Sequence, residues 1–169
     1  MVQSIAISFN QLKSLIYLSD SAESLENQTH HLLNTSLCFG KKLRVMLVDP
    51  LEEYRSYSEK VSTYISSKKE ISEIAQQLIF EVNRRLEGDL YWLIFMPNIK
   101  VIVEHGLSEK DLDFLFKNGL RVGLHFVIGG EHSYIGNNIH EVPKYLKSNA
   151  QWVMLGMRLM DQMFLDKPY

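Results

Sequence analysis

Apolar, β-rich runs separated by helical stretches are the feature that most limits what this chain can fold into. The clearest run is LYWLIFM at residues 90–96, which is too short for a helix of its own. Continuous apolar runs of this length are typical of strands buried on both faces of a parallel sheet. Further strands are expected at SIAISF (4–9), SLIYLS (14–19), LRVMLVDP (43–50), RVGLHFVIGG (121–130) and AQWVMLGM (150–157).

Helical patterns lie between these runs. Ser19, Asp20 and Ser21 offer side-chain caps for a helix that ends near Gly40. The spacing of the tyrosines in EYRSYSEKVSTYI predicts a helix within residues 52–65, and further helices are expected at 71–87, 108–119 and 142–149. EHSYIGNN, at 131–138, reads as a polar loop. This alternation predicts one α/β domain over residues 1–169, with a mostly parallel sheet covered by helices on both faces.

Ligands of parallel α/β sheets bind beyond the carboxyl ends of the strands, where LIYLSDSAESLEN has the outline of a phosphate-binding unit. A working P-loop reads G-x-x-x-x-G-K-[ST], and its lysine neutralises phosphate charge. If Ser19 takes the first glycine position, Ser24, Leu25 and Glu26 take the last three positions. Shifting the register by one residue places Asp20, Leu25, Glu26 and Asn27 there. Both registers lack the lysine and bring acidic side chains near, which disfavours a triphosphate.

The apolar run at 90–96 ends without a ligand for a hard cation. In P-loop ATPases the matching strand ends in an aspartate that positions Mg²⁺. Met96 and Pro97 stand here instead, and neither side chain ligates Mg²⁺. Glu131, His132, His140 and Glu141 surround a polar loop, but their loose spacing predicts no metal site. No bound cofactor is therefore expected in this chain.

Charge and cysteine content exclude several classes of protein. The formal net charge of −2, with both signs interspersed, disfavours a nucleic-acid partner. The single cysteine, Cys38, excludes an internal disulfide framework and favours a reducing compartment. No apolar run approaches the length of a membrane span, so any membrane attachment is expected from other parts of a longer protein.

Several segments in this order resemble a known family. They are the P-loop-like unit, RVMLVDP, a helical excursion ending in EVNRRLE, the apolar strand, LSEKDLDFLFKNGLRVGLHFVIGG, and WVMLGMRLMDQMF. Together they resemble an ATPase domain of the FtsK/SpoIIIE type. The resemblance is closest to the last of the tandem ATPase domains in type VII secretion coupling proteins, the EssC/EccC family. It covers nearly the whole chain.

The resemblance implies a RecA-like, three-layer P-loop NTPase-type fold at the end of a membrane-anchored protein, with this domain in the cytoplasm. It implies two kinds of partner, which are secreted helical-hairpin proteins and neighbouring ATPase domains of the same coupling protein. Because both catalytic motifs depart from the active pattern, the domain is expected to be catalytically silent. ATP and Mg²⁺ are then expected only at other domains of the full protein.

Two alternatives remain open at this stage. The chain is an ATPase if nucleotide binds in an unconventional way, or if a neighbouring subunit completes the site and Arg84, Arg85, Arg121 or Arg158 acts in trans. The wider family also suggests a DNA-translocase-like module, against which the charge balance speaks.

A run of late methionines suggests a surface for binding proteins. Met154, Met157, Met160 and Met163 recur every three residues, and Phe164 follows them. These side chains either fill the core or form an adaptable apolar patch for helical ligands, with Met157, Met160, Met163 and Phe164 as the candidate patch.

Overall fold

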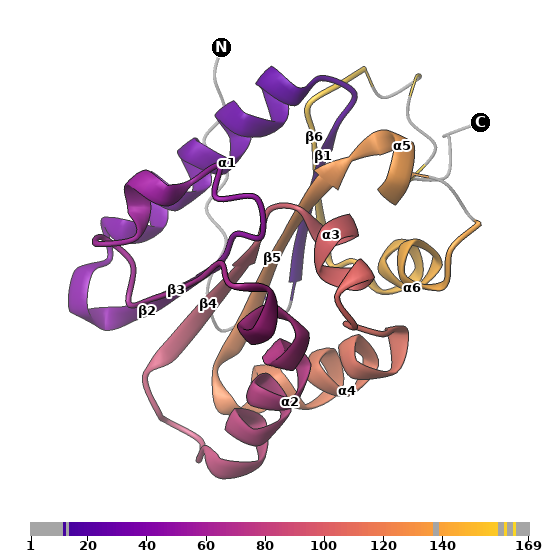
Figure 1. Ribbon diagram of the computed structural model, residues 1–169. Helices are drawn as coiled ribbons and strands as arrows, with labels where there is room; N and C mark the ends of the chain where they lie inside the picture. The colour runs from indigo at the N-terminus through magenta and orange to yellow at the C-terminus, as the bar shows by residue number, and fades with distance from the viewer. Residues whose placement is uncertain (1–11, 13, 137–138, 159–160, 162–163, 165–169) are drawn as a thin grey trace.

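A six-stranded sheet in which all strand pairs are parallel forms the centre of the molecule (Figure 1). A computed structural model describes residues 12, 14–136, 139–158, 161 and 164. The strand order is β3-β2-β4-β5-β1-β6. The strands are β1 (Ser14–Ser19), β2 (Leu43–Val48), β3 (Thr63–Ile65), β4 (Tyr91–Met96), β5 (Leu124–Glu131) and β6 (Trp152–Leu155). The expected α/β fold with a parallel sheet is confirmed.

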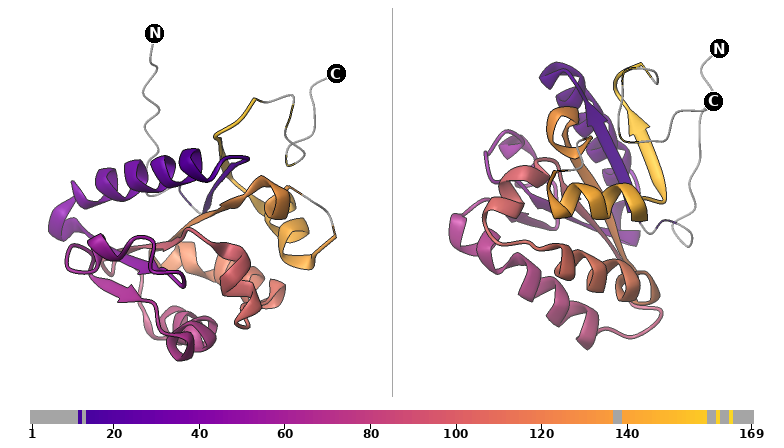
Figure 2. Two further views of the ribbon diagram at one scale, coloured as in Figure 1. Left: turned by 45° about the horizontal axis from the view of Figure 1, so that its top comes forward. Right: turned by 90° about the vertical axis from the view of Figure 1, so that its right-hand side faces the viewer.

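Helices cover both faces of this sheet, which gives three layers. Figure 2 shows α1 on one side of the sheet and α2 and α4 on the opposite side. The helices are α1 (Ala22–Leu37), α2 (Lys68–Arg84), α3 (Ile99–Glu104), α4 (Glu109–Gly119), α5 (His132–Ile135) and α6 (Glu141–Asn149). Short 3-10 turns lie at Gly40–Lys42, Arg55–Tyr57 and Leu120–Val122.

The alternation of side chains along each strand builds two apolar cores. Tyr17, Leu47 and Phe95 point to the face that packs against α1. Ile16, Met46 and Ile94 point to the opposite face, where α2, α3, α4 and α6 cover them. Strands buried on both faces explain why the sequence runs are continuously apolar instead of alternating.

Serine side chains cap the starts of three helices. Ser21 caps α1 by accepting a hydrogen bond from the Ser24 amide, and Ser67 caps α2 in the same way. Ser108 and Asp111 form a reciprocal capping box at the start of α4. These side chains satisfy backbone donors that the helix itself leaves unpaired.

The prediction of a helix within residues 52–65 is wrong. This segment instead holds a 3-10 turn and the edge strand β3. The carboxylate of Asp49 accepts hydrogen bonds from the amides of Glu53 and Tyr54 and from the Tyr64 hydroxyl, and these bonds fix a compact loop. The helical spacing of the tyrosines therefore has another cause, since Tyr54 and Tyr57 are buried beneath α1.

Two short helices were also not predicted. α3 follows β4 directly, and α5 begins in the segment interpreted as a polar loop. The strand expected from residue 121 begins only at Leu124, because Gly123 adopts a left-handed conformation with φ of 75° that reverses the chain after α4. The strand expected at 4–9 lies outside the described residues.

Candidate functional site

The connection between β1 and α1 occupies the place of a phosphate-binding loop. β1 ends at Ser19 and α1 begins at Ala22, so only Asp20 and Ser21 link the two elements. Asp20 is exposed, and Ser21 is committed to capping the helix. A P-loop needs several backbone N–H groups curled around the phosphates. A connection of two residues cannot form such a cradle.

A backbone carbonyl of the segment after β6 lies against this turn. The hydroxyls of Ser19 and Ser24 both donate to the carbonyl oxygen of Gly156, at 3.1 and 3.3 Å. The amide of Gly156 donates to the carbonyl of Leu18 at 2.8 Å. A Cβ atom at residue 156 would lie 2.5 Å from the Ser24 Oγ, so the approach is as close as glycine allows. Both serine donors are thus already used within the chain.

The remaining positions of the P-loop-like unit lie on the first turns of α1. Leu25 packs against the apolar core beneath the helix, while Glu26 and Asn27 are exposed. The Glu26 carboxylate lies 3.5 Å from the Nε2 atom of His30. None of these three side chains supplies a cation where the P-loop lysine would stand.

At the end of β4, Met96 and Pro97 are both buried. Met96 belongs to the core on the α2 face, so its thioether serves packing. Asn98, which follows them, is the first polar side chain after this strand. Among the described residues, no group of three or more histidine, cysteine, aspartate or glutamate side chains could hold a metal ion.

A cavity of about 280 Å³ does open at the carboxyl ends of the strands. Its lining comes from the start of α1, the β2–β3 connection, the residue after Pro97 and the end of β5, and consists of Ala22, Leu25, Glu26, Glu53, Tyr54, Asn98, Gly130 and Glu131. Three of these residues are carboxylates and none is a lysine or arginine. Glu53 is exposed at the mouth of this cavity, where partial desolvation raises its pKa and the negative charges of Asp49, Glu26 and Glu131 raise it further. The field in this cavity therefore opposes an anionic ligand.

The predicted methionine patch is only partly described. Met157 is half-buried, and Met160 and Met163 lie outside the described residues. Phe164 is fully buried in the core on the α2 face. Its side chain therefore lies in the interior and does not contribute to the surface.

The four arginines proposed to act in trans differ in their surroundings. Arg84 pairs with Glu81, and Arg85 is held by the carbonyls of Val122 and Leu90 with its guanidinium over the ring of Trp92. Arg121 and Arg158 are exposed. Only the latter two have side chains free of such structural contacts, as far as the described residues extend.

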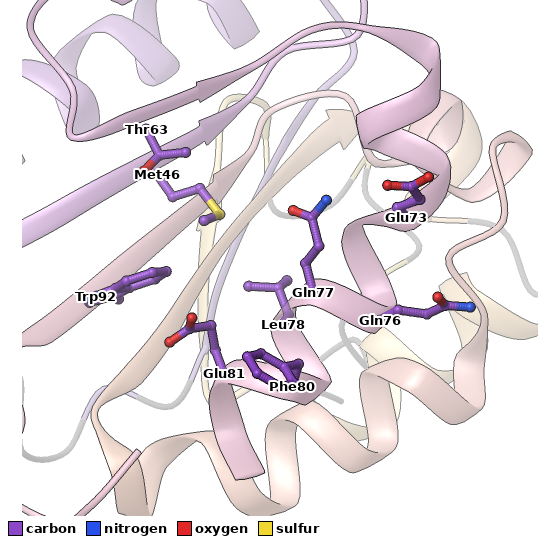
Figure 3. Close-up of a pocket in the computed structure, with 9 residues that line it drawn as sticks. All are labelled: Met46, Thr63, Glu73, Gln76, Gln77, Leu78, Phe80, Glu81 and Trp92. Atoms are coloured by element: carbon purple, nitrogen blue, oxygen red, sulfur yellow. The ribbon is translucent and has the colours of Figure 1, made fainter. Parts of the chain in front are cut away.

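A second cavity is a groove of about 620 Å³ between α2 and the β3 edge of the sheet. We call it the α2 groove. Its lining comprises Met46, Thr63, Glu73, Gln76, Gln77, Leu78, Phe80, Glu81 and Trp92. Figure 3 shows Gln77, Leu78 and Glu81 projecting from α2 toward the strands that carry Met46 and Trp92.

Sequence reasoning missed both the groove and most of the acidic cavity. The groove was missed because β3 was interpreted as part of a helix. The sequence does contain one signal for the groove. Residues 73, 77, 80 and 81 form a second stripe on α2 beside the stripe that faces the core. For the cavity, the signal was two acidic residues near strand ends, namely Glu53 in the connection after β2 and Glu131 as the last residue of β5.

Known proteins resemble this chain along nearly its whole length. No protein-family model matches it. The type VII secretion system protein EssC of Staphylococcus aureus (strain MRSA252) is 21% identical over 164 residues, which is 94% of this chain and 11% of that protein. The structure of ATPases 2 and 3 of EssC from Geobacillus thermodenitrificans matches with a TM-score of 0.70 and 12% identity, over 98% of this chain and 33% of that one. The chain is similar to EssC/EccC-type ATPase domains and shares their fold.

A third relative contains a bound peptide. It is Thermomonospora curvata EccC (ATPases 2 and 3) in complex with a signal sequence peptide, with a TM-score of 0.61 and 14% identity over 89% of this chain and 31% of that one. The chain thus spans about a ninth of the curated EssC protein and about a third of the EssC and EccC structures. Within the described residues, no helix is long and apolar enough to cross a membrane.

Proposed function

We propose that this domain serves type VII protein export as an ATPase-like module that recognises proteins and does not hydrolyse ATP. The observation that carries the proposal is the two-residue β1–α1 connection, whose serine hydroxyls are already bonded to the Gly156 carbonyl. A nucleotide would have to displace that carbonyl and still find no loop long enough to surround its phosphates.

The charges around the cavity also disfavour nucleotide binding. A lysine about 4 Å from a phosphate contributes roughly 4 kcal/mol of attraction at an effective dielectric constant of about 20. A carboxylate at that distance contributes a repulsion of similar size, and a helix N-terminus returns only about 1 kcal/mol. With Glu26, Glu53 and Glu131 around the cavity and no cation in its lining, Mg-ATP is disfavoured there.

The relatives support the protein-binding half of the proposal. The EccC structure that resembles this chain holds a signal sequence peptide, and EssC and EccC chains contain several ATPase domains. The partners proposed here are accordingly secreted helical-hairpin proteins and neighbouring ATPase domains. The domain would lie in the cytoplasm as part of a longer membrane-anchored protein, with ATP and Mg²⁺ bound at its other domains.

Isothermal titration with Mg-ATP tests the silent site. We expect no heat of binding at micromolar nucleotide, in parallel with a P-loop ATPase that binds under the same buffer conditions. A micromolar dissociation constant would contradict the proposal. ATP turnover that is lost in Arg121→Ala or Arg158→Ala would favour the alternative in which a neighbouring subunit completes the site.

Pulldown of secreted helical-hairpin proteins, with and without their C-terminal tails, tests the recognition role. Retention of the intact proteins and loss of the truncated ones is expected. Salt-dependent retention of DNA would instead support a translocase-like module, which the acidic cavity and net charge disfavour.

A further inference from the structure

We infer that residues 4–9, with the sequence SIAISF, pair with the outer edge of β6 as an antiparallel strand and thereby secure the contact of Gly156 with the β1–α1 turn. This pairing concerns the chain's own assembly and goes beyond the proposed function, which names only external partners.

The outer edge of β6 presents backbone groups to which no described strand is paired. In the described part of the chain, β6 pairs with β1 alone. The Gly156 amide donates to the Leu18 carbonyl of β1 at 2.8 Å. Because the amides alternate in direction along a strand, those of Val153 and Leu155 point away from β1. Such an edge is a template for a further strand.

A buried hydrogen-bond acceptor beside β6 also lacks a donor. The Oε1 atom of Gln28 is buried and accepts no hydrogen bond from any described residue. Gln28 lines a cavity of about 430 Å³ between α1 and Met154 of β6, and the other lining residues of this cavity are polar. An unsatisfied buried acceptor is destabilising, so we expect the segment that covers this edge to bring a donor.

The sequence of residues 4–9 matches both faces of this edge. Its apolar and small residues alternate as in a strand with one apolar face, with Ile5, Ile7 and Phe9 on one side and Ser4, Ala6 and Ser8 on the other. Val153 and Leu155 pack on the core that α2 and α4 cover, whereas Met154 packs on the α1 side. The apolar side of 4–9 therefore fits beside Val153 and Leu155, and the serine side fits beside Met154 and the Gln28 acceptor.

Chain connectivity selects β6 over β3, which is the other outer strand of the described sheet. Leu12 is buried, and its carbonyl accepts a hydrogen bond from the Nδ1 atom of His125 near the start of β5. The chain thus enters β1 from the amino ends of the strands. Strands lie about 4.8 Å apart, so the outer side of β6 is about 10 Å from β1 and that of β3 about 24 Å.

The link between residues 4–9 and β1 is short. Residues 10–13 bridge at most about 17 Å when fully extended, which reaches the outer side of β6 but not that of β3. The link is also too short to return to the carboxyl ends of the strands, so residues 4–9 run antiparallel to β6. An antiparallel edge strand is common on an otherwise parallel sheet.

This pairing secures the contact that fills the place of the phosphate loop. β6 ends at Leu155 and continues directly into Gly156, whose carbonyl accepts hydrogen bonds from Ser19 and Ser24. A strand on the outer side of β6 fixes its backbone from both sides. Residues 4–9 therefore help to keep the Gly156 carbonyl on the two serines.

Disulfide trapping in the full chain tests the pairing, in a Cys38→Ser background that removes the native exposed thiol. Met154→Cys is combined with one cysteine at a time on the serine side of the segment, as Ser4→Cys, Ala6→Cys or Ser8→Cys. At least one pair should cross-link within the chain under mild oxidation, because facing residues of paired strands have Cβ atoms about 4.5–5.5 Å apart. Thr63→Cys on β3 replaces Met154→Cys in the matched control and should cross-link to none of them.

Amide hydrogen exchange measured by NMR gives a second test. The amides of Val153 and Leu155 should exchange slowly in the wild-type chain, although they point away from β1. Ile7→Lys places a charge on the apolar side of the segment and should speed exchange of both amides about tenfold or more. Gln3→Lys adds the same charge outside the segment and should leave their exchange unchanged.

Three results would overturn the pairing. The first is that Met154→Cys cross-links to none of the three positions, and the second is that Ile7→Lys leaves exchange at Val153 and Leu155 unchanged. The third is that the cross-links join two chains, which makes a second copy the occupant of the β6 edge. Both readouts are independent of nucleotide and of exported proteins, so any of these results leaves the proposed function standing.

Discussion

At the scale of single residues, the carboxyl group of Glu53 makes the electrostatic character of the acidic cavity measurable. Partial desolvation and the carboxylates of Asp49, Glu26 and Glu131 raise the pKa of Glu53. The folded state therefore holds this proton more tightly than the unfolded state does. Stability contributed by the proton is present below the ordinary glutamate pKa of about 4.3 and is lost as the pH rises through the raised value.

We expect Glu53→Gln to raise the free energy of unfolding more at pH 7 than at about pH 4, because protonation of Glu53 on acidification removes the charge that its neighbours repel. Urea unfolding of both proteins at the two pH values measures the difference. Glu59→Gln serves as the control, since Glu59 is an exposed carboxylate outside the cavity. A stabilisation of Glu53→Gln that is equal at both pH values would argue against this account of the cavity.

The individual site residues illustrate what one sequence can reveal. The local sequence directly shows that residues 19–27 hold no P-loop lysine. It also shows that β4 ends in Met96 and is followed by Pro97. The contact of Gly156 with Ser19 and Ser24 joins residues more than 130 positions apart, and no local pattern indicates it. Its cause is the pairing of β6 beside β1, which depends on the order of strands in the sheet.

At the scale of elements, a buried hydrogen bond links α1 to the sheet. The hydroxyls of Tyr17 and Thr29 lie 2.9 Å apart, and the Thr29 hydroxyl donates to the carbonyl of Leu25. Thr29 has one hydroxyl proton, so Tyr17 is the donor in the pair. Both side chains are fully buried.

The two partners should therefore respond unequally to mutation. Tyr17→Phe removes one hydrogen bond and should lower the free energy of unfolding by about 1 kcal/mol. Thr29→Val leaves the Tyr17 hydroxyl buried without its acceptor and should cost more, within about 1–3 kcal/mol. Urea titration of both variants and of the double variant measures the coupling, and the double variant should cost less than the sum. Equal losses in the two single variants would contradict the assigned donor.

Elements with a strong local signal were predicted well from the sequence, and those set by distant contacts were not. The strands at 14–19 and 90–96 and the helix at 108–119 appear within a few residues of their expected bounds. The segment 52–65 failed because the carboxylate of Asp49 and burial under α1 overrode its helical spacing. Tertiary packing and side-chain hydrogen bonds to the loop backbone override a weak helical propensity of this kind.

At the scale of the whole molecule, the strand order places the two candidate surfaces at different ends of one scaffold. The acidic cavity gathers residues from the carboxyl ends of the strands, whereas the α2 groove lies at the β3 edge. A parallel sheet was predictable from the alternation of runs, but its order was not. The short β3 that opens the groove was therefore beyond the reach of the sequence alone.

This arrangement predicts how amide hydrogen exchange will be distributed. β4 and β5 are each paired with strands on both sides, and their residues form the centre of both cores. Their amides should exchange only through global unfolding, while those of the three-residue edge strand β3 should exchange through local opening. Hydrogen exchange followed by mass spectrometry measures this difference, and exchange of the β4 and β5 amides as fast as that of β3 would contradict it.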